Sequence, residues 1–142
     1  MSDRPLLFSI AIPTRWGDED RYGHINNVVY FRYFEEARVQ WLRNLSEHAV
    51  PVDGRETGPV VIEVAATYLK PLHYPATVIV KAYVRKLGTS SLILDHELVT
   101  AEHPETIYTR GHAAIVWVDH RINKAIPLPE AMRTHLQGFV AT

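Results

Sequence analysis

The chain has 142 residues, of which 46% are hydrophobic and 22% are charged, and its formal net charge is -1. This length predicts a single domain, residues 1–142, with its own core. The near-neutral charge argues against nucleic-acid binding, and no segment is apolar for long enough to cross a bilayer. The absence of cysteine excludes a disulfide scaffold, a thiolate nucleophile and Cys-based metal sites. Without a signal-peptide pattern at the N-terminus, we expect a cytoplasmic protein.

The chain begins with a predicted strand and a polar loop. Apolar residues alternate with smaller ones between Phe8 and Ile12, which predicts a strand over residues 8–13. The following stretch, WGDEDRYGHINN, carries three carboxylates, a histidine and two asparagines, and its glycines favour a loop. Asn26 or Asn27 is expected to cap a helix, because asparagine is a good N-cap residue.

A long helix is predicted from that cap to about Leu45. Apolar residues recur at helical spacing, namely Tyr30, Phe34, Ala37, Trp41 and Leu45. Phe31 and Leu42 widen the apolar stripe, so the helix is expected to be covered over much of its circumference. Arg32 and Glu36 are expected to form an exposed pair one turn apart.

The second half of the chain predicts a sheet. Residues 46–59 have loop composition, and four runs rich in Val, Ile, Tyr and Thr follow at 60–70, 77–87, 90–100 and 106–119. A short helix is predicted over residues 130–137. Four consecutive strands with short connections predict an antiparallel sheet, and the long helix must pack on one face of it. The fold class is therefore α+β.

The stretch WGDEDRYGHINNVVYFRYFEEAR, residues 16–38, resembles the signature of the 4-hydroxybenzoyl-CoA thioesterase-like branch of the hotdog superfamily. That signature reads D-x-D-x-x-G-H-x-N-N-x-x-Y, followed by an E-x-A-R helix. YLKPL and KLGTSSLIL correspond to two weaker family motifs, and H-x-N-N-x-x-Y is also similar to plant acyl-carrier-protein thioesterases. The resemblance implies a five-stranded antiparallel sheet wrapped around one long central helix. It also implies hydrolysis of an acyl-CoA thioester to free acid and CoA, without a cofactor.

The resemblance assigns the catalytic aspartate to Asp20 and the amides that polarise the thioester carbonyl to Asn27 and Val28. A helix N-terminus favours negative charge, so Asp20 is expected to stay ionised. It would act as a nucleophile or as the base that activates water, and the sequence leaves both open. His24 is interpreted either as a hydrogen-bond partner of Asp20 or the thioester, or as a packed loop histidine.

Asp18 and Glu19 are interpreted as solvated loop carboxylates or as partners of Arg15 or Arg21. Asp18, Asp20 and His24 offer oxygen and nitrogen ligands, but they lack strict spacing and a fourth ligand, so no metal site is expected.

Substrate-binding residues are expected around the helix start and in the sheet. Asn26 is expected to cap the helix or contact substrate, and Tyr30 to belong to the core or line an acyl pocket. Glu63 interrupts an apolar strand, so it should lie at a sheet edge or be paired. It is the reserve candidate for a second active-site carboxylate.

Two further positions follow from the resemblance. Gly88, Thr89 and Ser90 stand where similar enzymes carry a basic cluster for the CoA phosphates. Thr89, Ser90 and Ser91 would therefore either hydrogen-bond pantetheine or phosphate, or form a plain hairpin turn. Gly58 stands where a second branch carries a carboxylate, and it is expected to face Asp20 from a neighbouring subunit.

Two alternative functions remain open. An acyl-carrier-protein thioesterase would need a basic docking surface for its acidic carrier. A non-catalytic acyl-CoA-binding protein on the same fold would not need Asp20. In each case we expect a homodimer or homotetramer, because one sheet leaves the helix partly uncovered and exposes a Val/Ile-rich edge.

Overall fold

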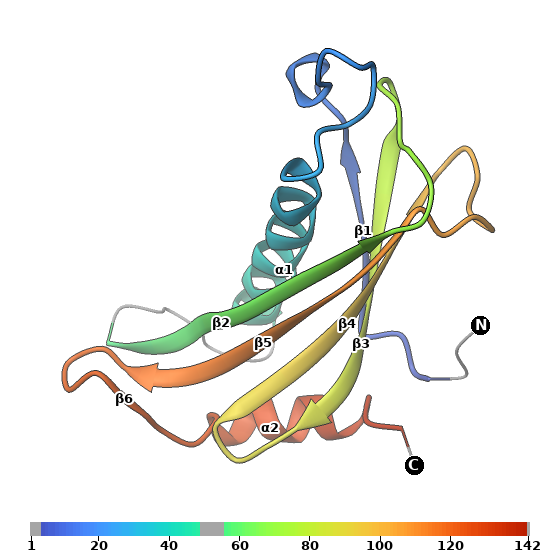
Figure 1. Cartoon of the computed structure of the whole chain (residues 1–142). Coiled ribbons are helices and arrows are strands. Elements are labelled where there is room, and N and C mark those ends of the chain that lie inside the picture. The colour runs from blue at the N-terminus through green and yellow to red at the C-terminus, as the bar shows by residue number, and fades with distance from the viewer. Residues whose placement is uncertain (1–3, 49–55, 142) are drawn as a thin grey trace.

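The computed structural model describes residues 4–48 and 56–141 and shows an antiparallel sheet packed against a long helix (Figure 1). The sheet has six strands in the order β1-β3-β4-β5-β2, with β6 paired to β5. The strands are β1 (Phe8–Pro13), β2 (Thr57–Tyr68), β3 (Thr77–Leu87), β4 (Ser91–Thr100), β5 (Thr109–Asp119) and β6 (Lys124–Ala125). The helices are η1 (Trp16–Asp18), α1 (Val29–His48) and α2 (Glu130–Gln137). The hotdog architecture is confirmed, with β6 as a short addition to the predicted five strands.

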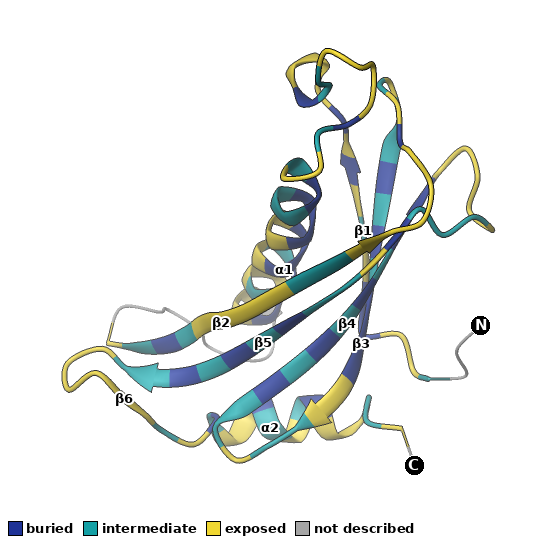
Figure 2. Cartoon of the chain, in the orientation of Figure 1, coloured by how far each residue is buried: buried dark blue, intermediate teal, exposed yellow. Residues whose placement is uncertain are grey.

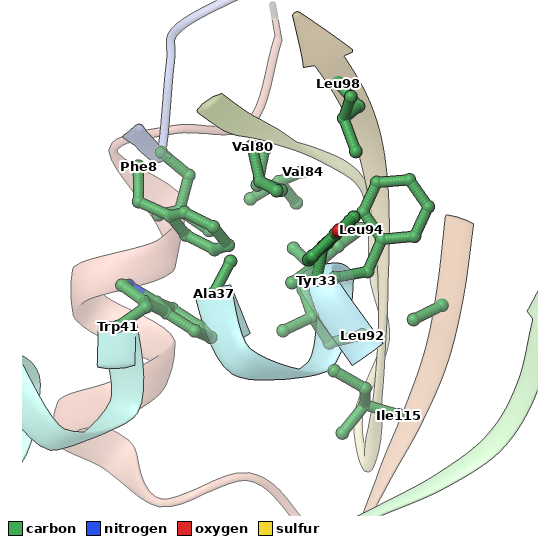
Figure 3. Packing of buried hydrophobic residues seen from close by; sticks show 14 of the residues in the cluster. Phe8, Tyr33, Ala37, Trp41, Val80, Val84, Leu92, Leu94, Leu98 and Ile115 are labelled. Carbon is green, nitrogen blue, oxygen red and sulfur yellow. The ribbon is translucent and has the colours of Figure 1, made fainter. Parts of the chain in front are cut away.

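The core lies between α1 and the sheet, which curves around the helix (Figures 1 and 3). Buried side chains from the helix and from four strands meet there, and they include Phe8, Tyr33, Ala37, Trp41, Val80, Val84, Leu92, Leu94, Leu98 and Ile115. Inward-facing residues alternate along β4, as the period of a strand with one buried face requires. Burying this apolar surface against α1 is the main stabilising contribution to the fold.

Most predicted boundaries are confirmed, and the deviations have local causes. The strands at 8–13 and 77–87 and the helix at 130–137 are confirmed to the residue. Helix α1 begins at Val29 rather than at Asn26 or Asn27 and continues to His48. Strand β2 begins at Thr57, inside the predicted loop of residues 46–59, and residues 49–55 of that loop lie outside the described residues. An edge strand tolerates the Gly-Pro pair at 58–59 that suggested a loop.

Strand β2 forms one edge of the sheet, and much of it is exposed (Figure 2). Four aliphatic residues lie along it with exposed fractions of 37% to 64%, namely Val60, Val61, Ile62 and Val64. None of the helices in the described ranges is both long and apolar enough to cross a membrane.

Candidate active site

A cavity of about 360 Å³ lies between the start of α1 and the connection from β2 to β3 (residues 69–76). It is lined by Asp20, His24, Ile25, Asn27, Tyr30, Tyr68, Leu69, Lys70 and Pro71. The fold therefore brings four predicted site residues together, because the polar loop after β1 leads directly into α1. The YLKPL motif supplies four of the lining residues, Tyr68 to Pro71, and these together with Ile25 are the lining residues that the sequence did not assign to the site.

Asp20 is held by the turn that it begins. Its Oδ1 accepts the backbone N–H groups of Tyr22 at 2.8 Å and His24 at 3.4 Å. The Asp20 N–H donates to the His24 carbonyl at 2.8 Å, and the Gly23 N–H donates to the Asp20 carbonyl at 3.1 Å. Gly23 has a φ of +78°, a backbone conformation that would be strained for a residue with a side chain. Oδ2 accepts no hydrogen bond from any residue that the structure describes, so it is available to a reactant in the cavity.

Asn27, which lines the same cavity as Asp20, lies just before the first turn of α1. The Asn26 side chain accepts the Val28 N–H at 3.3 Å, and its carbonyl accepts the Val29 N–H at 2.9 Å. Asn26 therefore acts as the predicted capping residue. In the described part of the chain the Asn27 N–H has no acceptor, so it can bind an oxygen that carries negative charge. The Val28 N–H could bind such an oxygen only after its hydrogen bond to the Asn26 side chain had broken.

Two tyrosines, one buried and one exposed, line the cavity. Tyr30 is buried, and its ring meets that of Tyr68 edge to face, with centroids 4.9 Å apart. Burial, with the nearby Tyr68 and Asp20, raises the pKa of Tyr30 to about 12, so its phenol stays neutral at physiological pH. The Tyr68 hydroxyl donates to the Asn27 carbonyl at 2.7 Å and so ties the end of β2 to the start of α1.

The His24 ring is exposed and packs edge to face against His73, with centroids 5.1 Å apart. Its hydrogen bond to the Asp20 side chain comes from the backbone N–H. The ring lines the cavity and remains available to a substrate.

Asp18 lies outside this cavity, and of its two predicted roles the solvated loop carboxylate is wrong, whereas the Arg15 partner is correct. Its side chain is fully buried and accepts bonds from Arg15, Arg32 and the Tyr33 hydroxyl, at 2.7 to 3.1 Å. Burial alone would raise its pKa, but these donors and the charge of Arg32 hold the pKa below its ordinary value. The predicted Arg15 partner is confirmed, whereas Arg32 bonds to Asp18 and not to Glu36.

Glu19 accepts the Tyr74 N–H at 3.3 Å, so its partner is backbone of the 69–76 connection rather than Arg15 or Arg21. Within the described ranges, no group of three or more His, Asp or Glu side chains is arranged to hold a metal ion.

The remaining candidates lie away from the cavity in this chain. Glu63 is both on the edge strand and paired, because its Oε1 lies 3.1 Å from His112 Nε2. Thr89, Ser90 and Ser91 belong to the β3–β4 hairpin, which lies beside α2 at the opposite end of the sheet (Figure 1). Arg133 of α2 donates to the carbonyls of Gly88 and Thr89 there. Gly58 lies near the start of β2, far along the strand from Tyr68.

Comparisons with known proteins agree on one family. Residues 14–136 match the Thioesterase-like superfamily. The PA2801 protein of Pseudomonas aeruginosa, whose thioesterase assignment is itself an inference, is 49% identical with a TM-score of 0.85, over 91% of this chain and 97% of that one.

Two relatives have named activities. The long-chain acyl-CoA thioesterase FadM of Escherichia coli is 26% identical over 121 residues, 85% of this chain and 90% of its own length. The chloroplastic acyl-acyl carrier protein thioesterase ATL3 of Arabidopsis thaliana is 23% identical over 131 residues, 92% of this chain and 68% of its own length.

Proposed function

The chain belongs to the thioesterase-like superfamily and is a thioester hydrolase, and on this premise we propose that it cleaves acyl-CoA thioesters to the free acid and CoA. The observation that carries the proposal is a cavity lined both by Asp20, whose Oδ2 accepts no hydrogen bond from the described residues, and by Asn27, whose N–H has no acceptor among them. Hydrolysis of a thioester requires a group that attacks the carbonyl carbon or activates water, and a donor for the carbonyl oxygen. A carboxylate and an unpaired amide at a helix start can supply these two functions.

In the proposed reaction, the thioester carbonyl oxygen binds the Asn27 N–H, which stabilises the negative charge that develops there. Such a donor typically lowers the activation free energy of the reaction by about 3 kcal/mol. The Asp20 carboxylate then attacks the carbonyl carbon, and the C–S bond breaks to release the CoA thiolate. Water hydrolyses the resulting anhydride to the free acid and the Asp20 carboxylate, and one proton of that water passes to the thiolate. Alternatively, Asp20 takes a proton from water as that water attacks, and the proton passes to the leaving thiolate. Both routes regenerate Asp20.

The substrate-binding roles of Gly58, Thr89, Ser90 and Ser91 require a second subunit. Ser91 pairs with Val116, and Val116 pairs with Val60, so the hairpin and Gly58 lie at the same end of the sheet. If two β2 strands pair antiparallel about a two-fold axis near their middle, the Gly58 end of one strand lies beside the Tyr68 end of the other. This arrangement brings the hairpin of one subunit toward the Asp20 cavity of the other, where it would bind the pantetheine or phosphates of CoA.

An acyl carrier protein is the second candidate donor of the acyl group. The similarity to the plant acyl-acyl carrier protein thioesterase favours it, whereas the net charge of -1 provides no evident basic surface for an acidic carrier. Hydrolysis assays with the same acyl group on CoA and on carrier protein distinguish the two donors by their kcat/KM ratio.

The proposed role of Asp20 is tested with Asp20→Asn, which keeps an oxygen for the Tyr22 and His24 amides but removes the charge. We expect kcat/KM for acyl-CoA to fall by at least about a thousandfold with an unchanged melting temperature. Asp18→Asn is the matched control, and it should keep its turnover per folded molecule. An active Asp20 variant beside an inactive, folded Asp18 variant would reverse the assignment.

A further inference from the structure

The turn that carries Asp20, residues 20–24, belongs to the loop between β1 and α1, which lies at one end of the molecule (Figure 1). Its internal bonds join Asp20 to Tyr22, Gly23 and His24, and the side chains of its middle residues, Arg21 and Tyr22, are exposed. Internal bonds define the shape of a turn but not its position over the cavity. Its position must come from contacts with other segments.

Those contacts come from the 69–76 connection. The Ile25 N–H donates to the Leu72 carbonyl at 2.8 Å, and the Leu72 side chain is buried. The N–H groups of Leu69 and Lys70 both donate to the Tyr108 carbonyl, so the connection is itself anchored to the segment before β5. Among the described residues, the one side-chain hydrogen bond from another segment to the turn is that of His73 Nδ1, which lies 2.8 Å from the Gly23 carbonyl oxygen.

The chemistry of this contact defines the donor. A carbonyl oxygen can only accept, so Nδ1 of His73 must carry the proton. The bond ends on Gly23, whose own N–H donates to the Asp20 carbonyl at 3.1 Å and whose positive φ shapes the turn. A displacement of Gly23 therefore displaces the Asp20 backbone. The His73 ring also packs edge to face on His24, the other polar side chain of the turn that lines the cavity.

We propose that His73 is a positioning residue for thioester hydrolysis: its Nδ1–H fixes the turn that carries Asp20 against the 69–76 connection. The inference rests on the proposed function, because it assigns His73 a role through Asp20. His73 does not line the cavity and touches no reacting atom. Its effect should therefore fall on the rate of the bound complex, since a displacement of about 1 Å at a reacting group can cost up to a hundredfold in rate.

Two variants separate the hydrogen bond from the ring contact. His73→Phe keeps a ring against His24 but has no donor. His73→Asn loses the ring but carries an N–H at the position of Nδ1. We expect His73→Phe to lower kcat at least about tenfold with KM changed less than about threefold, and His73→Asn to recover most of kcat. His120→Phe, at an exposed histidine beyond β5, is the matched control and should behave as the wild type.

Amide hydrogen exchange provides a readout that does not depend on activity. The N–H groups of Tyr22 and His24 bond to Asp20 Oδ1, so their exchange reports on the turn directly. They should exchange faster in His73→Phe than in the wild type or His73→Asn, while amides of β4 stay protected in all three.

The outcomes are distinguishable. Equal kcat in the wild type and His73→Phe, or an equal loss in His73→Phe and His73→Asn, would overturn the role of the Nδ1–H bond. A wild type that hydrolyses no member of an acyl-CoA panel would refute the proposed function instead. In that case amide hydrogen exchange tests the contact between His73 and Gly23 by itself. Faster exchange at Tyr22 and His24 in His73→Phe supports this contact, and unchanged exchange overturns it.

Discussion

Two aspartates in the D-x-D motif have opposite surroundings, although one residue separates them. Asp18 is fully buried among donors, whereas Asp20 keeps one carboxylate oxygen free in a cavity. The sequence could predict the Arg15 partner of Asp18, because it lies three residues away. It could not predict Arg32 and Tyr33, because their contacts depend on how the first turns of α1 fold back against the loop.

Asp18→Asn should destabilise the folded protein. The variant leaves Arg32 and the Tyr33 hydroxyl with a poorer acceptor, and a broken buried pair costs about 3–5 kcal/mol. Since Arg15 is largely exposed and water can replace part of its interaction, we expect a loss of about 2 kcal/mol. Urea denaturation at pH 7 measures this loss.

The pH dependence of that loss has a defined sign. The pKa of Asp18 lies below its ordinary 3.8 in the folded state, so its stabilisation is complete above about pH 4 and disappears as the pH falls through the folded-state pKa. The wild type and Asp18→Asn should therefore converge in stability on acidification below pH 4. A constant difference down to pH 2 would contradict this linkage.

Because of His96, the free energy of unfolding should fall as the pH is lowered from 7.5 to 5.5. It is buried on β4, and burial, together with the charge of Arg38, lowers its pKa to about 3. The unfolded chain binds a proton below about pH 6.5 and the folded chain does not, so folding loses about 1.4 kcal/mol over this interval through His96. His96→Gln keeps an acceptor for the Arg38 Nη1 at 3.0 Å but does not titrate. Urea denaturation at both pH values should show a smaller drop for the variant, and equal drops would refute the assignment.

At the scale of elements, periodicity predicted the fold well wherever one face of an element is buried. Strand β3 and helix α2 were correct to the residue because their apolar spacing is regular. The start of β2 was missed because its Gly-Pro pair has the composition of a loop, and only its edge position makes the pair acceptable. The site was predictable only in part. The residues before and at the helix start are close in sequence, whereas the lining residues of the 69–76 connection are brought next to them only by the fold.

The close approach of α1 to β5 depends on Gly111. A Cβ at this position would lie 2.8 Å from Phe34 Cε2 and 2.9 Å from the Ala65 carbonyl oxygen. Gly111→Ala should therefore push the helix and the sheet apart and cost about 1–3 kcal/mol, as overpacking usually does. Gly17→Ala is the control, because a Cβ there meets nothing within 4 Å and should change stability by less than about 0.5 kcal/mol. Thermal denaturation of both variants checks the prediction, and equal melting temperatures would contradict it.

At the scale of the whole molecule, the exposed edge of β2 favours the prediction that the working unit contains more than one chain. Its four exposed aliphatic residues have exposed fractions of up to 64%, and a long unpaired edge is an aggregation liability for a lone chain. The other edge, β1, has only six residues, against twelve in β2. Pairing β2 with a second copy covers the apolar edge and satisfies its backbone groups at once.

We therefore predict a homodimer or larger homo-oligomer in which each cavity is completed by the neighbouring subunit. Light scattering at micromolar concentration should give at least twice the 16.2 kDa of one chain. Ile62→Lys places a charge in the middle of the edge, where two copies would meet, so it should shift the protein toward monomers and lower hydrolysis together with mass. Ile122→Lys changes an equally apolar, exposed residue beyond β5 and should leave both unchanged. The prediction fails if the fully active species has the mass of a single chain, because the hairpin and Gly58 would then have no route to the Asp20 cavity.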